Sequence, residues 1–481
     1  MEKMVLKNSV KLGIFLVTLM TVLSVVNYYF RDQALSFLDS FFNSNKNDNQ
    51  QVINDPEHIQ QPDQESTQQD LNIISFGQEL LGSKAEKQYL VLFQNSMELR
   101  PGGGFIGSFA EIKVADQQIQ EKTVHNTAVF DRMVQKKPVP PYVVETYLKV
   151  DRLGIKDCNW HLDFSSNARQ FIELYKTTDR AKPIDGVIGL TTEILPFILE
   201  LTGPVTIDQV SGEFTKENAL EKLEYEVEVG YKDRGASKDE RKSIMEPLLS
   251  AIINKVQAMN KLDQLFMISK IQELMDKKVI QFYFLDNRMQ NYVEKHNWAG
   301  QLVKAEDTDY LAIVEANLGA LKTDRCMERR LSYIVDYTRP QPIANLKINY
   351  NHTCQEKDFM TGDYQSFLRI YTQQDSRLIT TQGFAQGLIK PATDPQDRAV
   401  IDSEADKKTF GNMTYIELGS GKEYEFTYLI NSGLVENYQL YFQKQPGLKP
   451  PWLEVVLKTS TGQTTLYNNQ VTQDVVIQNT P

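Results

Sequence analysis

The chain has 481 residues, of which 41% are hydrophobic and 24% are charged. It can therefore bury a large core, and its length exceeds what one core usually fills. The formal net charge of −11, without a basic patch interleaved with aromatic residues, excludes non-specific binding to nucleic acid. The three cysteines are too few for a disulfide framework and too scattered for a zinc site. A Cys326–Cys354 bridge is an alternative, but the odd count favours thiols that share no role.

The first 70 residues predict a membrane anchor and a tether. Residues 12–30 contain no charged side chain, and as a helix they would span about 28 Å, close to the ~30 Å hydrocarbon core. Three lysines within residues 1–11 predict a cytoplasmic N-terminus and an extracytoplasmic body. A cleaved signal peptide is the alternative, but its apolar region would be shorter and would end in small residues. Residues 31–70, rich in Asn and Gln, predict a flexible tether.

Residues 71–330 predict an α/β domain with an α-β-α layered fold. Short apolar runs bounded by polar residues indicate buried strands, and helical patterns alternate with them. Lys238–Asn260 repeats apolar residues every three or four positions, which indicates a helix that packs on the sheet. The expected strands are 87–94, 105–114, 119–124, 184–190, 205–207 and 279–285, and the other expected helices are 191–203 and 262–277.

Residues 331–481 predict an antiparallel β-sandwich. Six short alternating or apolar runs are separated by Gly, Asn, Asp and Pro, a spacing typical of such folds. Alternation is clearest in EYEFTYL, where Tyr424, Phe426 and Tyr428 should share one side of a strand.

The most distinctive segment is QNSMELRPGGGFIG, from Gln94 to Gly107. Gly102, Gly103 and Gly104 permit positive φ and close approach of a ligand, and their N–H groups could form an anion-binding nest. Arg100 beside them could pair with a phosphate or carboxylate. The alternative is a glycine-rich strand connection in which Glu98 and Arg100 form a local ion pair. The segment is neither a P-loop nor a Rossmann fingerprint.

FQNSMELRPGGGFIGSF resembles the FQN-x-x-ELRPTGGFIGS signature of a bacterial family catalogued as domain of unknown function 4012. Further segments resemble that family in the same order, and the resemblance extends from about residue 72 to 460. The quoted segments are VDRLGIKDCNWHLDFSSNARQF, IDGVIGLTTEILPFILELTGPV, EANLGALKTDRCMERRLSYIV and YFQKQPG. The family has no settled activity.

The order of segments also resembles the LytR-CpsA-Psr family, whose single-pass enzymes transfer glycopolymers from a polyprenyl-pyrophosphate carrier to the cell wall. YKDRGASKDERKSIMEPLLSAI is similar to the arginine-containing helix of that family. The resemblance implies that Arg100, Arg234 and Arg241 face the pyrophosphate, with Arg132 as a further candidate. That family also holds Mg²⁺ with an aspartate, but Gly102 stands at the corresponding position here, and Mg²⁺ requires carboxylate oxygens.

Three aspartates near these motifs, Asp157, Asp163 and Asp185, are candidate acids, although aspartates in such turns usually cap helices. Trp160 and His161 could line a sugar site, or simply pack in the core. The five histidines form no metal-binding pattern, so no metal ligands are predicted.

The sequence as a whole predicts a membrane-anchored protein of the cell envelope. It would bind or transfer a lipid-linked glycan or cell-wall polymer, with Mg²⁺ as the cofactor that the family resemblance allows. The alternative is a non-catalytic envelope protein that recognises a polymer or a partner. A third hypothesis is a glycosidase, an enzyme that needs two carboxylates placed across a cleft.

Overall fold

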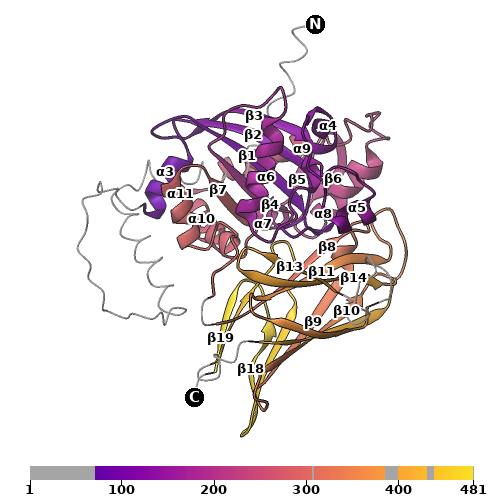
Figure 1. The fold of residues 1–481 in the computed structure, drawn as a ribbon. Helices are drawn as coiled ribbons and strands as arrows, with labels where there is room; N and C mark the ends of the chain where they lie inside the picture. The colour runs from indigo at the N-terminus through magenta and orange to yellow at the C-terminus, as the bar shows by residue number, and fades with distance from the viewer. Residues whose placement is uncertain (1–70, 306–307, 385–398, 431–437, 480–481) are drawn as a thin grey trace, which may run out of the picture.

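The computed structural model describes residues 71–305, 308–384, 399–430 and 438–479. The predicted transmembrane helix at 12–30 and the tether at 31–70 lie outside these residues. Within them, no helix combines the length and the apolar character that crossing a bilayer requires. Figure 1 shows a helix-rich part, purple to pink, beside a part made of orange and yellow strands.

Residues 71–305, which we call the α/β domain, are built on a five-stranded mixed sheet. The strand order is β3-β2-β1-β4-β7. β1 is parallel to β4 and antiparallel to β2, and β7 is antiparallel to β4. The strands are β1 (Lys87–Asn95), β2 (Phe105–Ala115), β3 (Gln118–Asn126), β4 (Gly186–Thr191) and β7 (Ile280–Phe284), and β5 (Val205–Ile207) and β6 (Val210–Phe214) form a separate hairpin.

Helices cover both faces of this sheet. Because successive side chains of a strand point to opposite faces, Leu90 and Leu92 belong to the core shared with α6, whereas Tyr89 and Val91 belong to the core shared with the other long helices. The predicted α/β layering is thus present. The helices are α3 (Ile73–Leu80), α4 (Thr127–Phe130), α5 (Tyr142–Leu148), α6 (Phe164–Lys176), α7 (Ile194–Thr202), α8 (Ala219–Tyr225), α9 (Met245–Gln257), α10 (Lys261–Asp276) and α11 (Asn287–Lys295).

The helix expected over 238–260 is shorter in the structure, where α9 begins at Met245. Pro247 lies in its first turn. Proline is tolerated there but not in a helix interior, where its ring would clash with the preceding turn. The residues before Met245 instead form a π-helical turn (Glu226–Gly230) and further turns, and these form one wall of the cavity described below.

The described residues between 309 and 479, which we call the β-rich region, form two six-stranded sheets that share one hydrophobic core. Tyr424, Phe426 and Tyr428 are all buried in this core, as predicted. The first strand, β8, begins at Asp309, upstream of the boundary expected near Leu331. The strands are β8 (Asp309–Asn317), β9 (Met327–Asp336), β10 (Ile343–His352), β11 (Tyr364–Gln373), β12 (Arg377–Gln382), β13 (Val400–Glu404), β14 (Lys407–Ile416), β15 (Gly421–Leu429), β16 (Gln439–Gln443), β17 (Trp452–Thr459), β18 (Gly462–Gln470) and β19 (Val475–Gln478).

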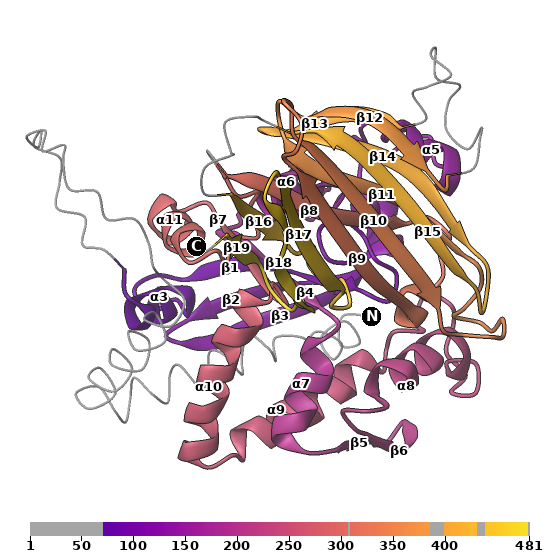
Figure 2. The same cartoon turned by 90° about the horizontal axis from the view of Figure 1, so that it is seen from below.

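The sheet orders are β12-β15-β10-β9-β17-β18 and β13-β14-β11-β8-β16-β19, and Figure 2 shows their strands running across the molecule above α7 to α10. Most neighbours are antiparallel, but β16 is parallel to β8 and β17 is parallel to β9. The prediction of a wholly antiparallel arrangement is therefore wrong at these two pairs. Both parallel pairs join strands far apart in the chain, which no local turn signal can reveal.

Cys326 and Cys354 form a disulfide, so the expectation of three unrelated thiols is wrong. β9 and β10 are antiparallel, and Met327 pairs with His352 at the open end of this pair. The two cysteines lie just beyond that end, with 5.5 Å between their Cα atoms, a separation suited to a disulfide. Cys158 is a buried free thiol, and burial raises its pKa well above the usual value.

Candidate ligand-binding cavity

Arg100, the first predicted phosphate ligand, is an internal ion-pair partner. Its side chain is 2% exposed, and Nη2 lies 3.2 Å from Glu98 Oε1 and 3.6 Å from Asp157 Oδ1. Nη1 donates to the Asn317 carbonyl, which belongs to β8 of the β-rich region. The structure thus contains the local ion pair between Glu98 and Arg100, which was the alternative interpretation of this segment.

The three glycines after Arg100 serve close packing between chain segments. The Gly102 N–H donates to the Asn159 carbonyl and the Gly103 N–H to the Arg100 carbonyl, so neither is available for an anion nest. A Cβ on Gly104 would lie 2.4 Å from the backbone of Asn95, and its φ of +152° is one that residues with a Cβ rarely adopt. These observations explain the glycines without a ligand.

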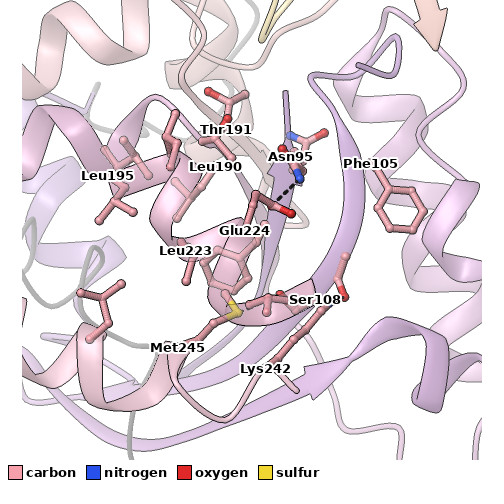
Figure 3. Close-up of a pocket in the computed structure, with 18 of the residues that line it drawn as sticks. Asn95, Phe105, Ser108, Leu190, Thr191, Leu195, Leu223, Glu224, Lys242 and Met245 are labelled. Atoms are coloured by element: carbon pink, nitrogen blue, oxygen red, sulfur yellow. Dashed lines mark hydrogen bonds between the residues drawn. The ribbon is translucent and has the colours of Figure 1, made fainter. Parts of the chain in front are cut away.

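An apolar cavity of about 200 Å³ lies a short distance away, between the sheet and helices α7, α8 and α9 (Figure 3). β1, β2 and β4 form its floor, and the helices form its walls. Because aliphatic and thioether side chains dominate this lining, the space suits an apolar chain better than a sugar or a nucleotide. Representative apolar residues are Phe105, Leu190, Leu195, Leu223, Met245 and Leu248.

Charged side chains also line this cavity. They form what we call the polar cluster: Glu224, Glu228, Arg241, Lys242 and Lys322. Lys322 Nζ lies 3.4 Å from Glu228 Oε1 and 3.9 Å from Glu224 Oε2. Arg241 forms an ion pair with Glu228, and Glu224 accepts a hydrogen bond of 2.8 Å from Asn95 (Figure 3). With both carboxylates ionised, three cations face two anions, which leaves an excess positive charge.

Burial shifts the pKa of two side chains in this cluster, Glu224 and Lys242. It raises the pKa of Glu224, although Lys322 partly offsets the effect. Burial, reinforced by the neighbouring Arg241, lowers the pKa of Lys242 to about 8, and the Lys242 ammonium donates to the Gly107 carbonyl. A bound anion would stabilise the protonated form of Lys242, because an opposite charge favours the charged state.

Of the four arginines predicted to face a pyrophosphate, Arg241 lines the cavity and the others do not. Arg234 forms an ion pair with Glu226. Arg132 is exposed and lies 3.1 Å from Asp239. The structure therefore does not bring Arg100, Arg132 and Arg234 into the cavity with Arg241. It places Lys242 and Lys322 there instead, which sequence reasoning missed although Lys242 directly follows Arg241.

The three candidate acids hold the fold together. Asp157 is buried beside Arg100. Asp163 is the N-cap of α6 and accepts a 2.6 Å hydrogen bond from the Ser166 N–H. Asp185 accepts a 2.8 Å hydrogen bond from the Gln88 N–H. None of the three lines the cavity.

Magnesium does not fit the residues of this cavity. Within the described part of the chain, no three His, Cys, Asp or Glu side chains are grouped to hold a metal ion. Glu224 and Glu228 are the carboxylates of the cavity, and Lys322 or Arg241 already neutralises them. Gly102 supplies no carboxylate at all.

Residues 84–227 match the model of a family described as protein of unknown function (DUF4012). The chain carries a DUF4012 domain. No curated protein matches the sequence. Among solved structures, the Lin1025 protein from Listeria innocua is 11% identical with a TM-score of 0.25, over 45% of this chain and 80% of that chain. B. subtilis TagV is 10% identical with a TM-score of 0.25, over 45% of this chain and 81% of that chain. Values this low say nothing about what the DUF4012 domain binds.

Proposed function

We propose that this chain is a single-pass, membrane-anchored protein of the cell envelope, and that it binds or transfers polyprenyl-pyrophosphate-linked glycopolymers. The lipid chain would enter the apolar cavity, and the pyrophosphate would lie against the polar cluster. One observation carries the proposal: an apolar cavity that includes a cluster with excess positive charge. An amphiphile with an apolar tail and an anionic head matches both features.

The proposed location outside the cytoplasm is supported by two independent features. The uncharged stretch at 12–30, preceded by lysines, has the length and flanking charges of an anchor with the N-terminus inside. The disulfide between Cys326 and Cys354 is typical of oxidising compartments, because cytosolic thiols are kept reduced.

Binding is tested on the full-length protein with farnesyl pyrophosphate, using farnesol and inorganic pyrophosphate as tail-only and head-only probes. We expect farnesyl pyrophosphate to bind most tightly in calorimetry. Arg241→Gln should weaken its binding about tenfold, since charge-assisted hydrogen bonds contribute about 1.5–3 kcal/mol. Leu195→Trp, which fills the cavity, should weaken farnesol and farnesyl pyrophosphate equally.

Arg234→Gln is the matched control, because Arg234 lies in the same segment and is also ion-paired but does not line the cavity. It should bind as the unaltered protein does. Equal losses in Arg234→Gln and Arg241→Gln, or unchanged binding in Leu195→Trp, would contradict the proposed site.

The second candidate function is that of a non-catalytic envelope protein that recognises polymer or partners through both of its parts. It is favoured by Gly102, which stands where the transferase family has a metal-holding aspartate. Incubation of the full-length protein with a pyrophosphate-linked glycolipid, Mg²⁺ and an acceptor polymer separates the two. Release of the glycan from its carrier eliminates this candidate, and binding without release supports it.

A further inference from the structure

The outer face of one sheet in the β-rich region carries a row of polar side chains interrupted by a tryptophan. The row crosses β15, β10, β9, β17 and β18, which are neighbours in this sheet. Figure 2 shows the backbone of these strands. Register pairs place Glu423 opposite Asn349, Asn349 opposite Arg330, Arg330 opposite Trp452, and Trp452 opposite Gln470. Neighbouring strands lie about 4.8 Å apart, so the row presents one side chain at each such step.

Trp452 is the exposed tryptophan of this protein. Its exposed fraction is 36%, against 8% for Trp160 and 2% for Trp298. The indole N–H donates a 2.6 Å hydrogen bond to Asn468 Oδ1, and the Arg330 guanidinium lies 5.3 Å from the ring centroid. The ring is therefore held in place by its neighbours while remaining open to solvent, an arrangement typical of a binding surface.

A hollow of about 390 Å³ adjoins this ring. It is lined by side chains that include Glu328, Arg330, Asn349, Asn351 and Lys449. Within the described residues, no hydrogen bond or ion pair engages the side chains of Arg330, Asn349 or Lys449. Their donors and acceptors are thus available to a ligand.

We propose that this hollow is a saccharide-binding site. A sugar ring presents C–H groups on one face, which pack on an indole, and hydroxyl groups around its edge, which amide, guanidinium and carboxylate groups can engage in pairs. Trp452 would supply the stacking surface, and Asn349, Arg330 and Glu328 would supply the hydrogen bonds. Of the two aromatic residues that line the hollow, Trp452 is exposed and Tyr350 is buried. One exposed ring among polar groups fits a saccharide rather than a protein partner, whose interface core would be broadly apolar.

This site is separate from the apolar cavity. The proposal rests on the second candidate function and specifies a saccharide as the ligand that is recognised. The cavity variants Arg241→Gln and Leu195→Trp should leave saccharide binding unchanged. Loss of one activity without the other therefore shows which of the two proposals has failed.

The test uses intrinsic fluorescence of the full-length protein titrated with chitotetraose, cellotetraose and tetragalacturonate. The protein has three tryptophans, and because two are buried, a ligand that stacks on Trp452 should change the emission of that residue selectively. We expect saturable binding of at least one of the three oligosaccharides. Saturation by none of them overturns the proposal.

Variants make the assignment specific. Trp452→Ala should weaken binding at least tenfold in calorimetry, Trp452→Tyr should retain most of it, and Asn349→Ala should weaken it severalfold. Tyr142→Ala, which removes an exposed ring on α5, is the matched control and should bind normally. Thermal melts verify folding of each variant. Equal affinities of Trp452→Ala and Tyr142→Ala would show that the oligosaccharide binds elsewhere.

Discussion

At the scale of single residues, the sequence shows which chemical groups are present but not which partners the fold gives them. Asp163 behaves as its local pattern predicts, because an N-cap depends only on residues a few positions away. Arg100 does not, because its partners include Asp157 and the carbonyl of Asn317, which are remote in sequence. Lys322 enters the polar cluster from the start of the β-rich region, so no local pattern could place it there.

Asp309 gives the folded protein a pH-dependent stability. Its carboxylate is buried, and burial raises its pKa to about 6 despite 2.7 Å hydrogen bonds from the Tyr333 and Tyr438 hydroxyls. The folded pKa exceeds the unfolded value of about 3.9, so the folded state binds the proton more tightly. Stability should therefore fall by about 2 kcal/mol as pH rises from about 4 to 6. Asp309→Asn should abolish this slope in denaturant titrations.

Glu404 provides the control for this experiment. Burial opposes its ionisation, but a hydrogen bond that the carboxylate accepts from His161 and the charge of Arg369 outweigh burial and lower the Glu404 pKa to about 2. Its contribution is present above pH 4.5 and is lost only as pH falls toward 2. Glu404→Gln should therefore keep the slope between pH 5 and 6. A slope that survives in Asp309→Asn would assign it to another group.

At the scale of elements, buried strands with apolar runs were predictable and polar strands were not. β1 was expected over 87–94 and spans Lys87–Asn95, because its centre is continuously apolar. β18 has the sequence GQTTLYNNQ and lies at a sheet edge. An edge strand needs little apolar surface, so its sequence resembles a loop. The start of α9 was expected at Lys238 but lies at Met245, because Pro247 is tolerated in the first turn of a helix and not in its interior.

The disulfide ties the short helix Thr323–Cys326 to the end of β10, and that helix contacts the α/β domain. Asp324 accepts a 3.0 Å hydrogen bond from the Leu99 N–H. The cysteines are 28 residues apart. Closing a loop of this length lowers the entropy of the unfolded chain and so raises its free energy by about 3–4 kcal/mol.

Reduction with dithiothreitol should therefore lower the melting temperature, and Cys354→Ser should melt at the lower value with or without reductant. Cys158→Ala should remain sensitive to reductant; insensitivity of the unaltered protein would exclude a stabilising role for the bridge.

At the scale of the whole molecule, the two parts are joined by buried polar contacts rather than by a linker alone. Gln445 Nε2 donates to the Arg100 carbonyl at 3.0 Å, and Gly447 packs against Gly103. The segments ELRPGGG and YFQKQPG, far apart in sequence, therefore meet at this junction, although only the first lies within the residues that the family model matches. Each segment stood out in the sequence, but their shared structural role depends on the docking of the two parts, which sequence periodicity does not encode.

Replacement of Lys278 in the α/β domain tests whether the α/β domain and the β-rich region unfold together. Its Nζ lies 2.8 Å from both carboxylate oxygens of Asp474, and both side chains are buried. Lys278→Met would leave Asp474 buried without its cation, and breaking such a pair costs about 3–5 kcal/mol. In calorimetry we expect the temperature of the main unfolding transition of the full-length protein to fall by several degrees. We also expect this transition to separate into two, because the substitution weakens the junction between the two parts.

Lys87→Met removes a more exposed cation, 3.5 Å from Asp185, and should change stability by less than about 1 kcal/mol. A single transition at an unchanged temperature in Lys278→Met would mean that the two parts hold together without this ion pair.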